Sequence, residues 1–397
     1  MPSYSRRVLQ FRSARINNTK HFSPKLFYTR ASWNRLAQHA MLKERRSNRL
    51  PRKSPPVGAA SPLKIVSIGG GTGLSTLLRG LKRYVKAAEG SLEITAIVTV
   101  TDDGGSSGRL RRDFDVLPPG DIRNCMVALA EYEGLISNLF QYRFSTGRGL
   151  KGHSFGNLFL TAMTHLTGDF AHAVTLSSQV LSVLGRIYPA TSANVELEAT
   201  LADGRKIRGE TRISRSTSRI ERIMLRPRKP KPLSETLDAI ANADLITLGP
   251  GSLFTSVIPN LLVDGVPEAI ANSPALKAYF VNLMWQPGET TNFRASDHVE
   301  AILRHCGKAR NMIDVCVVNT GSLPGRLLNP YQAKSAQPVV NDTENLEALG
   351  LEVLSADLLR MSRAKVGQKI RHDPGSIGAV TLELAQQGRR RKRKLKL

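Results

Sequence analysis

The sequence is poor in cysteine, in aromatic residues and in long apolar runs. Its three cysteines, Cys125, Cys306 and Cys316, form no CxxC pair, so neither a disulfide framework nor a zinc site is indicated, and a reducing, intracellular compartment fits best. No apolar run approaches the roughly 18 residues that a membrane span needs, and no apolar segment of a secretory signal precedes the folded part. We therefore expect no membrane partner and a cytoplasmic protein.

Acidic residues are scarce at both ends of the chain. Residues 1–62 hold fourteen Lys or Arg against the single acid Glu44, and residues 389–397 hold seven basic residues and no acid. These two segments supply most of the formal net charge of +25. We interpret 1–62 as a disordered basic arm and 389–397 as a basic tail that contact polyanions weakly. A transit peptide is the alternative for the arm, which would place the protein in an organelle.

Between these segments, the pattern over residues 63–388 predicts one α/β domain. Apolar strands run into glycines and are followed by helices, as in LKIVSIGGG and the helix after it. This alternation predicts a Rossmann-like three-layer α/β/α fold with a mostly parallel sheet, whose ligands bind at the carboxyl ends of the strands. Residues 194–226 change to alternating runs around Asp203-Gly204, which predicts a small β-hairpin insertion.

Two glycine-rich segments each follow a predicted strand and open a helix. Their glycines allow backbone N–H groups to approach a phosphate, and the helix N-terminus adds partial positive charge. Neither matches a Walker A loop, and each alone also suits a tight turn without a ligand. Together they predict a shared anion site, with the candidate residues Gly70, Gly71, Thr72, Gly73, Gly249, Gly251, Ser252 and Thr255.

Two adjacent carboxylates, Asp102 and Asp103, end another predicted strand. Such a pair suits ribose hydroxyls, Mg²⁺ or a general base, although an exposed acidic turn gives the same pattern. Further polar candidates come from the segments that follow strands or begin helices: Ser106, Ser107, Arg109, Arg123, Asn124, His153, Ser154, Asn157 and Asn282. Asp121 suits an N-cap as well as a ligand contact. Asp102, Asp103 and His153 are the candidate catalytic residues.

The ordered motifs IGGGTGLSTLLRGLK, TDDGGSSGRLR, LPPGDIRNC, GHSFGNLF, ADLITLGPGSLFTSVIPNLLV and QPGETTNFRASDHV strongly resemble the gluconeogenesis factor family (YvcK-like proteins). That family is a branch of the superfamily of 2-phospho-L-lactate transferase (CofD). The resemblance covers roughly residues 63–320. Trp285 stands where a Thr is expected in this family, a departure that concerns ligand selectivity rather than fold.

The resemblance implies a cytoplasmic regulator that binds UDP-sugars such as UDP-N-acetylglucosamine and is linked to carbon metabolism and cell shape. In the transferase branch it implies transfer of a phospholactyl group with Mg²⁺, and Asp102 and Asp103 match the shared acidic pair. We thus expect a nucleotide or nucleotide-sugar ligand, with a phospholactyl transferase and a polyanion-associated protein as alternatives. We also expect a homo-oligomer.

Overall fold

The computed structural model describes residues 61–87, 91–132, 134–323, 325–332, 335–359 and 369–395. The predicted arm therefore lies outside the described residues except for Ser61 and Pro62. The described part forms one compact unit. Its first half contains β1 (Leu63–Gly69), α2 (Gly71–Ala87), β2 (Leu92–Val98), α3 (Gly105–Phe114), α4 (Gly120–Leu129), α5 (Leu135–Gln141), α6 (Phe155–Thr167), α7 (Phe170–Val180) and β3 (Arg186–Pro189).

The second half begins with a small antiparallel sheet and then returns to strands of the main sheet. Its elements are β4 (Glu196–Leu201), β5 (Lys206–Arg208), α8 (Glu210–Ile213), β6 (Ile220–Arg226), α9 (Ser234–Asn242), β7 (Leu245–Leu248), the π-helix η1 (Leu253–Val257), α10 (Ile258–Leu261), α11 (Val266–Asn272), β8 (Leu276–Phe280), α12 (Ala295–His305), β9 (Val315–Asn319), α13 (Gly325–Gln332), α14 (Thr343–Ala348), β10 (Glu352–Ala356) and α15 (Pro374–Lys394).

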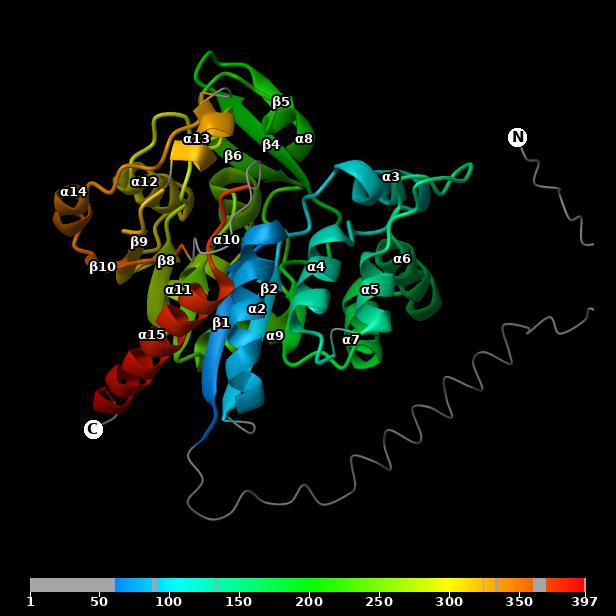
Figure 1. The fold of residues 1–397 in the computed structure, drawn as a ribbon, viewed down its shortest axis with the longest axis horizontal. Coiled ribbons are helices and arrows are strands. Elements are labelled where there is room, and N and C mark those ends of the chain that lie inside the picture. Colours follow the sequence, from blue (N-terminus) through cyan, green and yellow to red (C-terminus); the bar gives the residue numbers. More distant parts are fainter. Residues whose placement is uncertain are drawn as a thin grey trace, which may run out of the picture. The chain divides into compact units, whose positions relative to one another are not determined.

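The main sheet has seven strands in the order β10-β9-β8-β7-β1-β2-β3, and every neighbouring pair is parallel. Helices α2, α4 and α15 pack together on one face, while α9, α10, α11 and α12 pack on the other (Figure 1). The predicted three-layer fold with a parallel sheet is confirmed. The strands are buried on both faces, which explains their nearly continuous apolar sequences.

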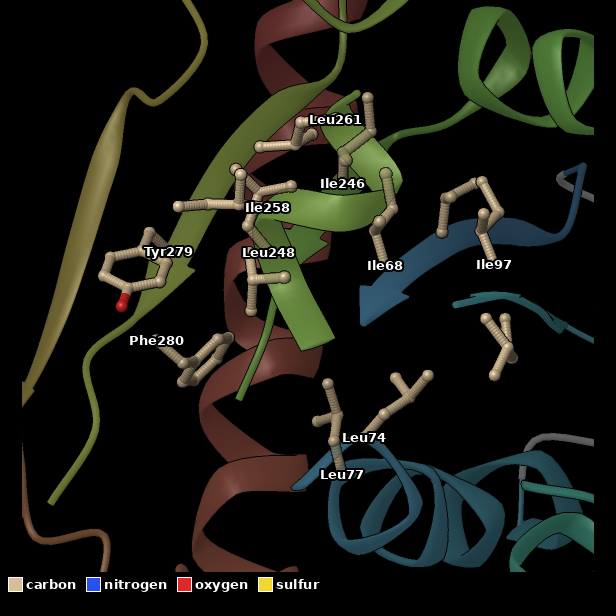
Figure 2. Close-up of a cluster of buried hydrophobic side chains, with 14 of the residues drawn as sticks. Ile68, Leu74, Leu77, Ile97, Ile246, Leu248, Ile258, Leu261, Tyr279 and Phe280 are labelled. Atoms are coloured by element: carbon tan, nitrogen blue, oxygen red, sulfur yellow. The ribbon is translucent and has the colours of Figure 1, made fainter. Parts of the chain in front are cut away.

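The core lies where β1, β7 and β8 meet the helices of both layers. Ile68 and Leu248 extend from adjacent strands, and Leu74 and Leu77 of α2 cover them from one side (Figure 2). All four side chains are fully buried. Helix α2 is thereby fixed against the sheet, so that its N-terminus points to the carboxyl edge of the strands.

The predicted hairpin insertion is confirmed as the three-stranded antiparallel sheet β5-β4-β6. Gly204 has φ = 80°, which glycine adopts without strain, and its N–H donates to the carbonyl of Leu201 in the turn between β4 and β5. The sheet carries α8, whose first residue is Glu210.

The prediction of a disordered basic tail from residue 389 is wrong for Arg389–Lys394, which form the last turns of α15. Arg389 pairs with Asp244 at 2.6 Å, and Arg391 pairs with Asp314 at 2.9 Å. These ion pairs hold the helix against the sheet. The net charge of the segment does not predict them, because Asp244 and Asp314 lie far from residues 389–394 in the sequence.

Within the described residues, no single helix has both the length and the apolar composition that a bilayer crossing requires. The two segments Leu253–Leu261 and Val266–Asn272, bent by 78°, satisfy those criteria only when they are taken as a pair.

Candidate functional site

The strand order brings four loops to one edge of the sheet. Strands β8, β7, β1 and β2 are consecutive neighbours, and the chain leaves each of them at its carboxyl end. After β1, the chain first adds β2 on one side of this strand. It later adds β7 on the other side of β1. The pair β1–β7 is therefore the topological switch point, where open α/β sheets commonly bind ligands.

The two glycine loops after β1 and β7 touch each other there. A Cβ built on Gly73 would lie 2.3 Å from the carbonyl oxygen of Pro250, so only glycine permits this approach. Gly71 opens α2 with φ = 60°. The first turn of α2 contains no acidic residue. The convergence of the two loops that the sequence predicted is therefore present in the fold.

A cavity of about 490 Å³ opens over these loops. Its lining combines backbone amides, carboxylates, amide side chains, apolar groups and two cations. The lining residues are Gly70, Gly71, Thr72, Gly73, Thr76, Asp102, Asp121, Glu210, Pro250, Gly251, Ser252, Ser256, Asn282, Leu283, Met284, Trp285, Gln286, Tyr331, Lys369, Ile370, Arg371 and His372.

Asp121 is not the N-cap that its position in the sequence suggested. Helix α4 begins at Gly120 after the cap residue Pro119, so Asp121 lies inside the first turn. Its carboxylate accepts the N–H of Gly71 and lies against Gly70. Burial, reinforced by the charge of Asp102, raises the pKa of Asp121 to about 7. One amide of the first glycine loop is thus already occupied by a carboxylate of the protein.

Asp102 and Asp103 do not act as a pair. Asp102 lines the cavity, and its Oδ1 accepts the N–H of Gly104 at 2.9 Å. Asp103 points to the small sheet, where its Oδ1 accepts the N–H of Thr211 at 2.8 Å and the hydroxyl of the same residue. The two carboxylates therefore point in different directions, and the Asp103 side chain fastens α8 to the domain.

The predicted joint Mg²⁺ site on these two residues does not fit this geometry. Among the described residues, no three His, Cys, Asp or Glu side chains converge closely enough to hold a metal ion. A cation would need Asp102 together with oxygen atoms from a ligand.

Glu210 supplies another carboxyl group to the cavity that sequence reasoning missed. Its Oε2 accepts the hydroxyl of Thr101 at 3.2 Å. Burial is the largest cause that raises the pKa of Glu210 well above its usual range, and the charges of Asp102 and Asp121 add to it. Burial also raises the pKa of Asp102. The three carboxyl groups therefore share one poorly solvated wall.

The predicted residues around His153 gather beside this wall without lining it. The ring Nδ1 of His153 lies 3.0 Å from the hydroxyl of Ser106, and the side-chain amide of Asn157 donates to the same hydroxyl at 3.2 Å. The hydroxyl of Ser107 donates to Asp102. Ser154 is the N-cap of α6. Ser107 is therefore the member of this cluster that is placed to orient Asp102. Burial lowers the pKa of His153.

Several predicted ligand residues have protein partners outside the cavity. Arg109 donates to the carbonyl of Lys151 at 2.8 Å, and the buried Arg123 donates to the side chain of Asn124 at 2.7 Å. Thr255 donates to the buried carboxyl of Glu289 at 3.2 Å. Gly249 is not part of the cavity lining, whereas Gly251, Ser252 and Asn282 line the cavity.

Comparison with known proteins identifies the fold and the family. The family model described as 2-phospho-L-lactate transferase CofD matches residues 65–359. The gluconeogenesis factor of Bacillus subtilis is 48% identical over 324 residues, which cover 82% of this chain and 98% of that protein. This chain belongs to the gluconeogenesis factor branch of the CofD family. The resemblance carried by the sequence motifs is thereby confirmed.

Two further relatives support the assignment. A putative gluconeogenesis factor of Nostoc sp. is 50% identical over 320 residues, which cover 81% of this chain and 68% of that protein. The crystal structure of a Bacillus halodurans protein superposes with a TM-score of 0.76 at 45% identity, over 81% of this chain and 100% of that chain. The fold described above is therefore shared with a solved structure over most of the chain.

The cavity residues that were not among the predicted site residues come mostly from two segments. Met284, Trp285 and Gln286 follow β8, and the segment Lys369–His372 precedes α15. Gln286 gave a usable signal, because it follows a strand within a polar loop, and it donates to Ser252 at 2.6 Å. The segment before α15 gave no such signal, and it lies beyond the residues that the CofD family model matches.

Proposed function

We propose that this protein binds a nucleotide sugar with a diphosphate bridge, such as UDP-N-acetylglucosamine, and acts as a regulator linked to carbon metabolism and cell shape. The observation that carries the proposal is the division of one cavity into three chemically different parts. The volume of about 490 Å³ is within the range of about 300–1,000 Å³ typical of small-molecule sites.

The middle of the cavity suits the diphosphate. The glycine loop after β1 offers the amides at the start of α2, where the helix dipole favours an anion. The loop after β7 adds Gly251 and the hydroxyl of Ser252. Lys369 and Arg371 supply the cations of the lining, and an arginine can bind two phosphate oxygens at once.

The two ends of the cavity suit the base and the sugar. The loop after β8 contributes Trp285 with the apolar neighbours Leu283 and Met284, while the loop after β2 contributes Asp102. Because β7 and β1 lie between β8 and β2, these ends are about 14 Å apart at the usual strand spacing. A base would pack on the apolar end, and sugar hydroxyls would donate to the carboxyl end.

Calorimetric titration of the full chain with UDP-N-acetylglucosamine tests the proposal. We expect saturable binding, with weaker binding of UDP and of N-acetylglucosamine 1-phosphate because each occupies only part of the cavity. At about a hundred times Kd the ligand should stabilise the fold by about 2.7 kcal/mol. A folded protein that shows neither heat nor a thermal shift with any of the three would reject the proposal.

A phospholactyl transferase is the second candidate, favoured by the position of Asp102 in the same cavity as the glycine loops. The acceptor hydroxyl would attack the lactate-bearing phosphorus of a guanosine-diphosphate-linked phospholactate, with GMP as leaving group. Mg²⁺ would be held by Asp102 and phosphate oxygens and would stabilise the developing charge. Incubation of this donor with a deazaflavin alcohol and Mg²⁺ tests it: no product from a protein that binds the donor would exclude this activity.

A further inference from the structure

A second cavity, of about 300 Å³, shares no lining residue with the cavity over the glycine loops. It lies where the loop between α8 and β6 of the small sheet meets the segment that leads from β8 into α12 (Figure 1). Its volume is at the lower limit of the range typical of small-molecule sites. The lining residues are Thr217, Ser218, Arg219, Gly288, Glu289, Thr291, Asn292, Phe293 and Asp297.

Contacts within the protein hold the walls of this second cavity in place. A side chain on Gly288 would collide with the carbonyl oxygen of Ser216, so the two loops touch directly. The guanidinium of Arg219 lies over the ring of Phe293, 5.6 Å from its centroid, which is within the range of a cation–π contact. Phe293 is buried, and its ring contacts that of Phe254 at a centroid distance of 6.1 Å. The guanidinium therefore has a defined position at the wall.

A buried carboxyl group belongs to the same lining. Oε1 of Glu289 accepts the hydroxyls of Ser214 and Thr255, each at 3.2 Å, and the N–H of Phe254 adds a contact to the carboxyl group. Oε2 is buried and has no hydrogen-bond partner among the described residues. Burial raises the pKa of Glu289 to about 7. Buried polar atoms normally have a partner, so this oxygen indicates a donor that a ligand supplies.

The charges of the lining have both signs. Arg219 supplies a cation, while Glu289 and Asp297 supply carboxyl groups from another segment. No ion pair within the described part of the chain involves any of these three side chains. A guanidinium binds a carboxylate through two parallel hydrogen bonds, and carboxyl groups accept hydrogen bonds from an ammonium group. The cavity therefore suits a small molecule that carries both groups.

We propose that the second cavity binds a free α-amino acid with a polar side chain, whose carboxylate pairs with Arg219 and whose ammonium group donates to Glu289 and Asp297. The hydroxyl and amide groups of the lining suit a polar side chain. Phe293 is the only apolar side chain among the lining residues, and the guanidinium lies over its ring.

Hydrogen bonds connect the second cavity to the first. The N–H of Glu289 donates to the carbonyl of Gln286 at 2.9 Å, and the side-chain amide of Gln286 donates to the hydroxyl of Ser252 at 2.6 Å. Gln286 and Ser252 both line the first cavity. An amino acid held by Glu289 would thus change the affinity for the nucleotide sugar. This coupling rests on the proposed function, whereas the amino-acid site itself does not.

Calorimetry and thermal denaturation of the full chain without nucleotide test the site, with L-serine, L-asparagine and L-glutamine as probes. We expect saturable binding of at least one of them, with a Kd below about 1 mM. Its N-acetyl derivative, which lacks the ammonium group, and its carboxamide, which lacks the carboxylate, should bind at least about tenfold more weakly. A folded protein that binds none of the three, or that binds either derivative equally well, would overturn the proposal. Saturable binding of glucose alone would likewise contradict it.

Two arginines of one loop provide the variant and its control. Arg219→Ala should abolish amino-acid binding with an unchanged circular dichroism spectrum, because the residue is exposed. Arg219→Lys should restore part of it, since it keeps the charge but not the paired donors. Arg215→Ala, exposed in the same loop but outside the lining, should bind like the wild type. Unchanged binding in Arg219→Ala would refute the assigned carboxylate position.

Titration with UDP-N-acetylglucosamine, with and without a saturating amino acid, tests the coupling. We expect its affinity to change at least about fivefold, and the amino-acid affinity to change by the same factor when the nucleotide sugar is present. An unchanged affinity would overturn the coupling alone. A protein that binds the amino acid but no nucleotide sugar would contradict the proposed function and the coupling, while it would support the second site.

Discussion

The amino edge of the parallel sheet differs from its carboxyl edge in how its aspartates are used. At the amino edge, Asp244 and Asp314 precede β7 and β9 and meet Arg389 and Arg391 of α15. At the carboxyl edge, Asp102 and two further carboxyl groups face a cavity and have raised pKa values. The aspartates at the amino edge thus stabilise the fold through ion pairs, whereas the carboxyl groups at the carboxyl edge line a cavity that suits a ligand.

Helix α15 connects the two edges. Its N-terminus follows the cavity residues Arg371 and His372, and its last turns carry the ion pairs at the opposite edge. A side chain on Gly388 would collide with the carbonyl of Asp244, so the helix lies directly on the sheet. Variants at the two ends should therefore separate binding from stability, and the predictions that follow test this separation.

The largest effect on ligand binding is expected for Gly73→Val. The new side chain would overlap the carbonyl of Pro250 and force the two glycine loops apart. We expect a loss of about 1–3 kcal/mol of unfolding free energy and no detectable binding of UDP-N-acetylglucosamine. Urea denaturation and calorimetry measure the two effects. Gly325→Val is the control, because no atom lies within 4 Å of its Cβ position; an equal loss of binding there would refute the explanation.

Arg389→Ala should reduce stability without affecting the cavity. It removes the 2.6 Å ion pair with Asp244, whose side chain is 9% exposed. Removing one partner of a largely buried pair should cost about 2–4 kcal/mol in unfolding free energy, whereas ligand affinity should stay unchanged. Arg393→Ala, on the exposed side of the same turns, should change stability by less than about 0.5 kcal/mol. A parallel loss of ligand affinity in Arg389→Ala would show that the two edges are coupled.

Asp121→Asn should remove one source of the pH dependence of the unfolding free energy. Because the folded state raises the pKa of Asp121 from 3.8 to about 7, its protonated form stabilises the fold below about pH 4, and this contribution is lost as the pH rises through about 7. We therefore expect the variant to be more stable than the wild type above pH 7, by up to about 4 kcal/mol for a pKa shift of about 3 units. The two proteins should converge toward pH 4. Ligand affinity of the wild type should also fall through pH 7, because an ionised carboxylate then repels the diphosphate.

Thermal denaturation between pH 4 and 9 provides the measurement. Glu383→Gln on the exposed face of α15 serves as the control for the removal of a carboxylate. Identical pH profiles for the wild type and Asp121→Asn would mean that the carboxyl group beside Gly71 is not the titrating one.

The sequence predicted the elements of this site better than its contacts. Buried strands followed by glycines identified the sheet, and the placement of the loops after β1 and β7 at one edge followed from parallel topology. The different directions of Asp102 and Asp103 depend on Thr211 of a distant insertion, and the buried position of Asp121 depends on Gly71 of another βα unit. Such contacts join residues about a hundred or fifty positions apart, so local patterns do not contain them.

The smallest effect is expected for Arg371→Ala. This variant also gives the clearest test of whether ligand binding and fold stability depend on opposite edges of the sheet. Arg371 lines the cavity immediately before α15, whereas Arg389 docks the other end of the same helix. Losing a cation that contacts a diphosphate should weaken binding of UDP-N-acetylglucosamine about tenfold, which corresponds to about 1.4 kcal/mol, with unfolding free energy unchanged. Arg371→Lys should recover part of the loss, because it keeps the charge but not the paired donors. If Arg371→Ala instead lowered stability as Arg389→Ala does, both ends of α15 would be structural, and the cavity would owe its anion affinity to the glycine loops alone.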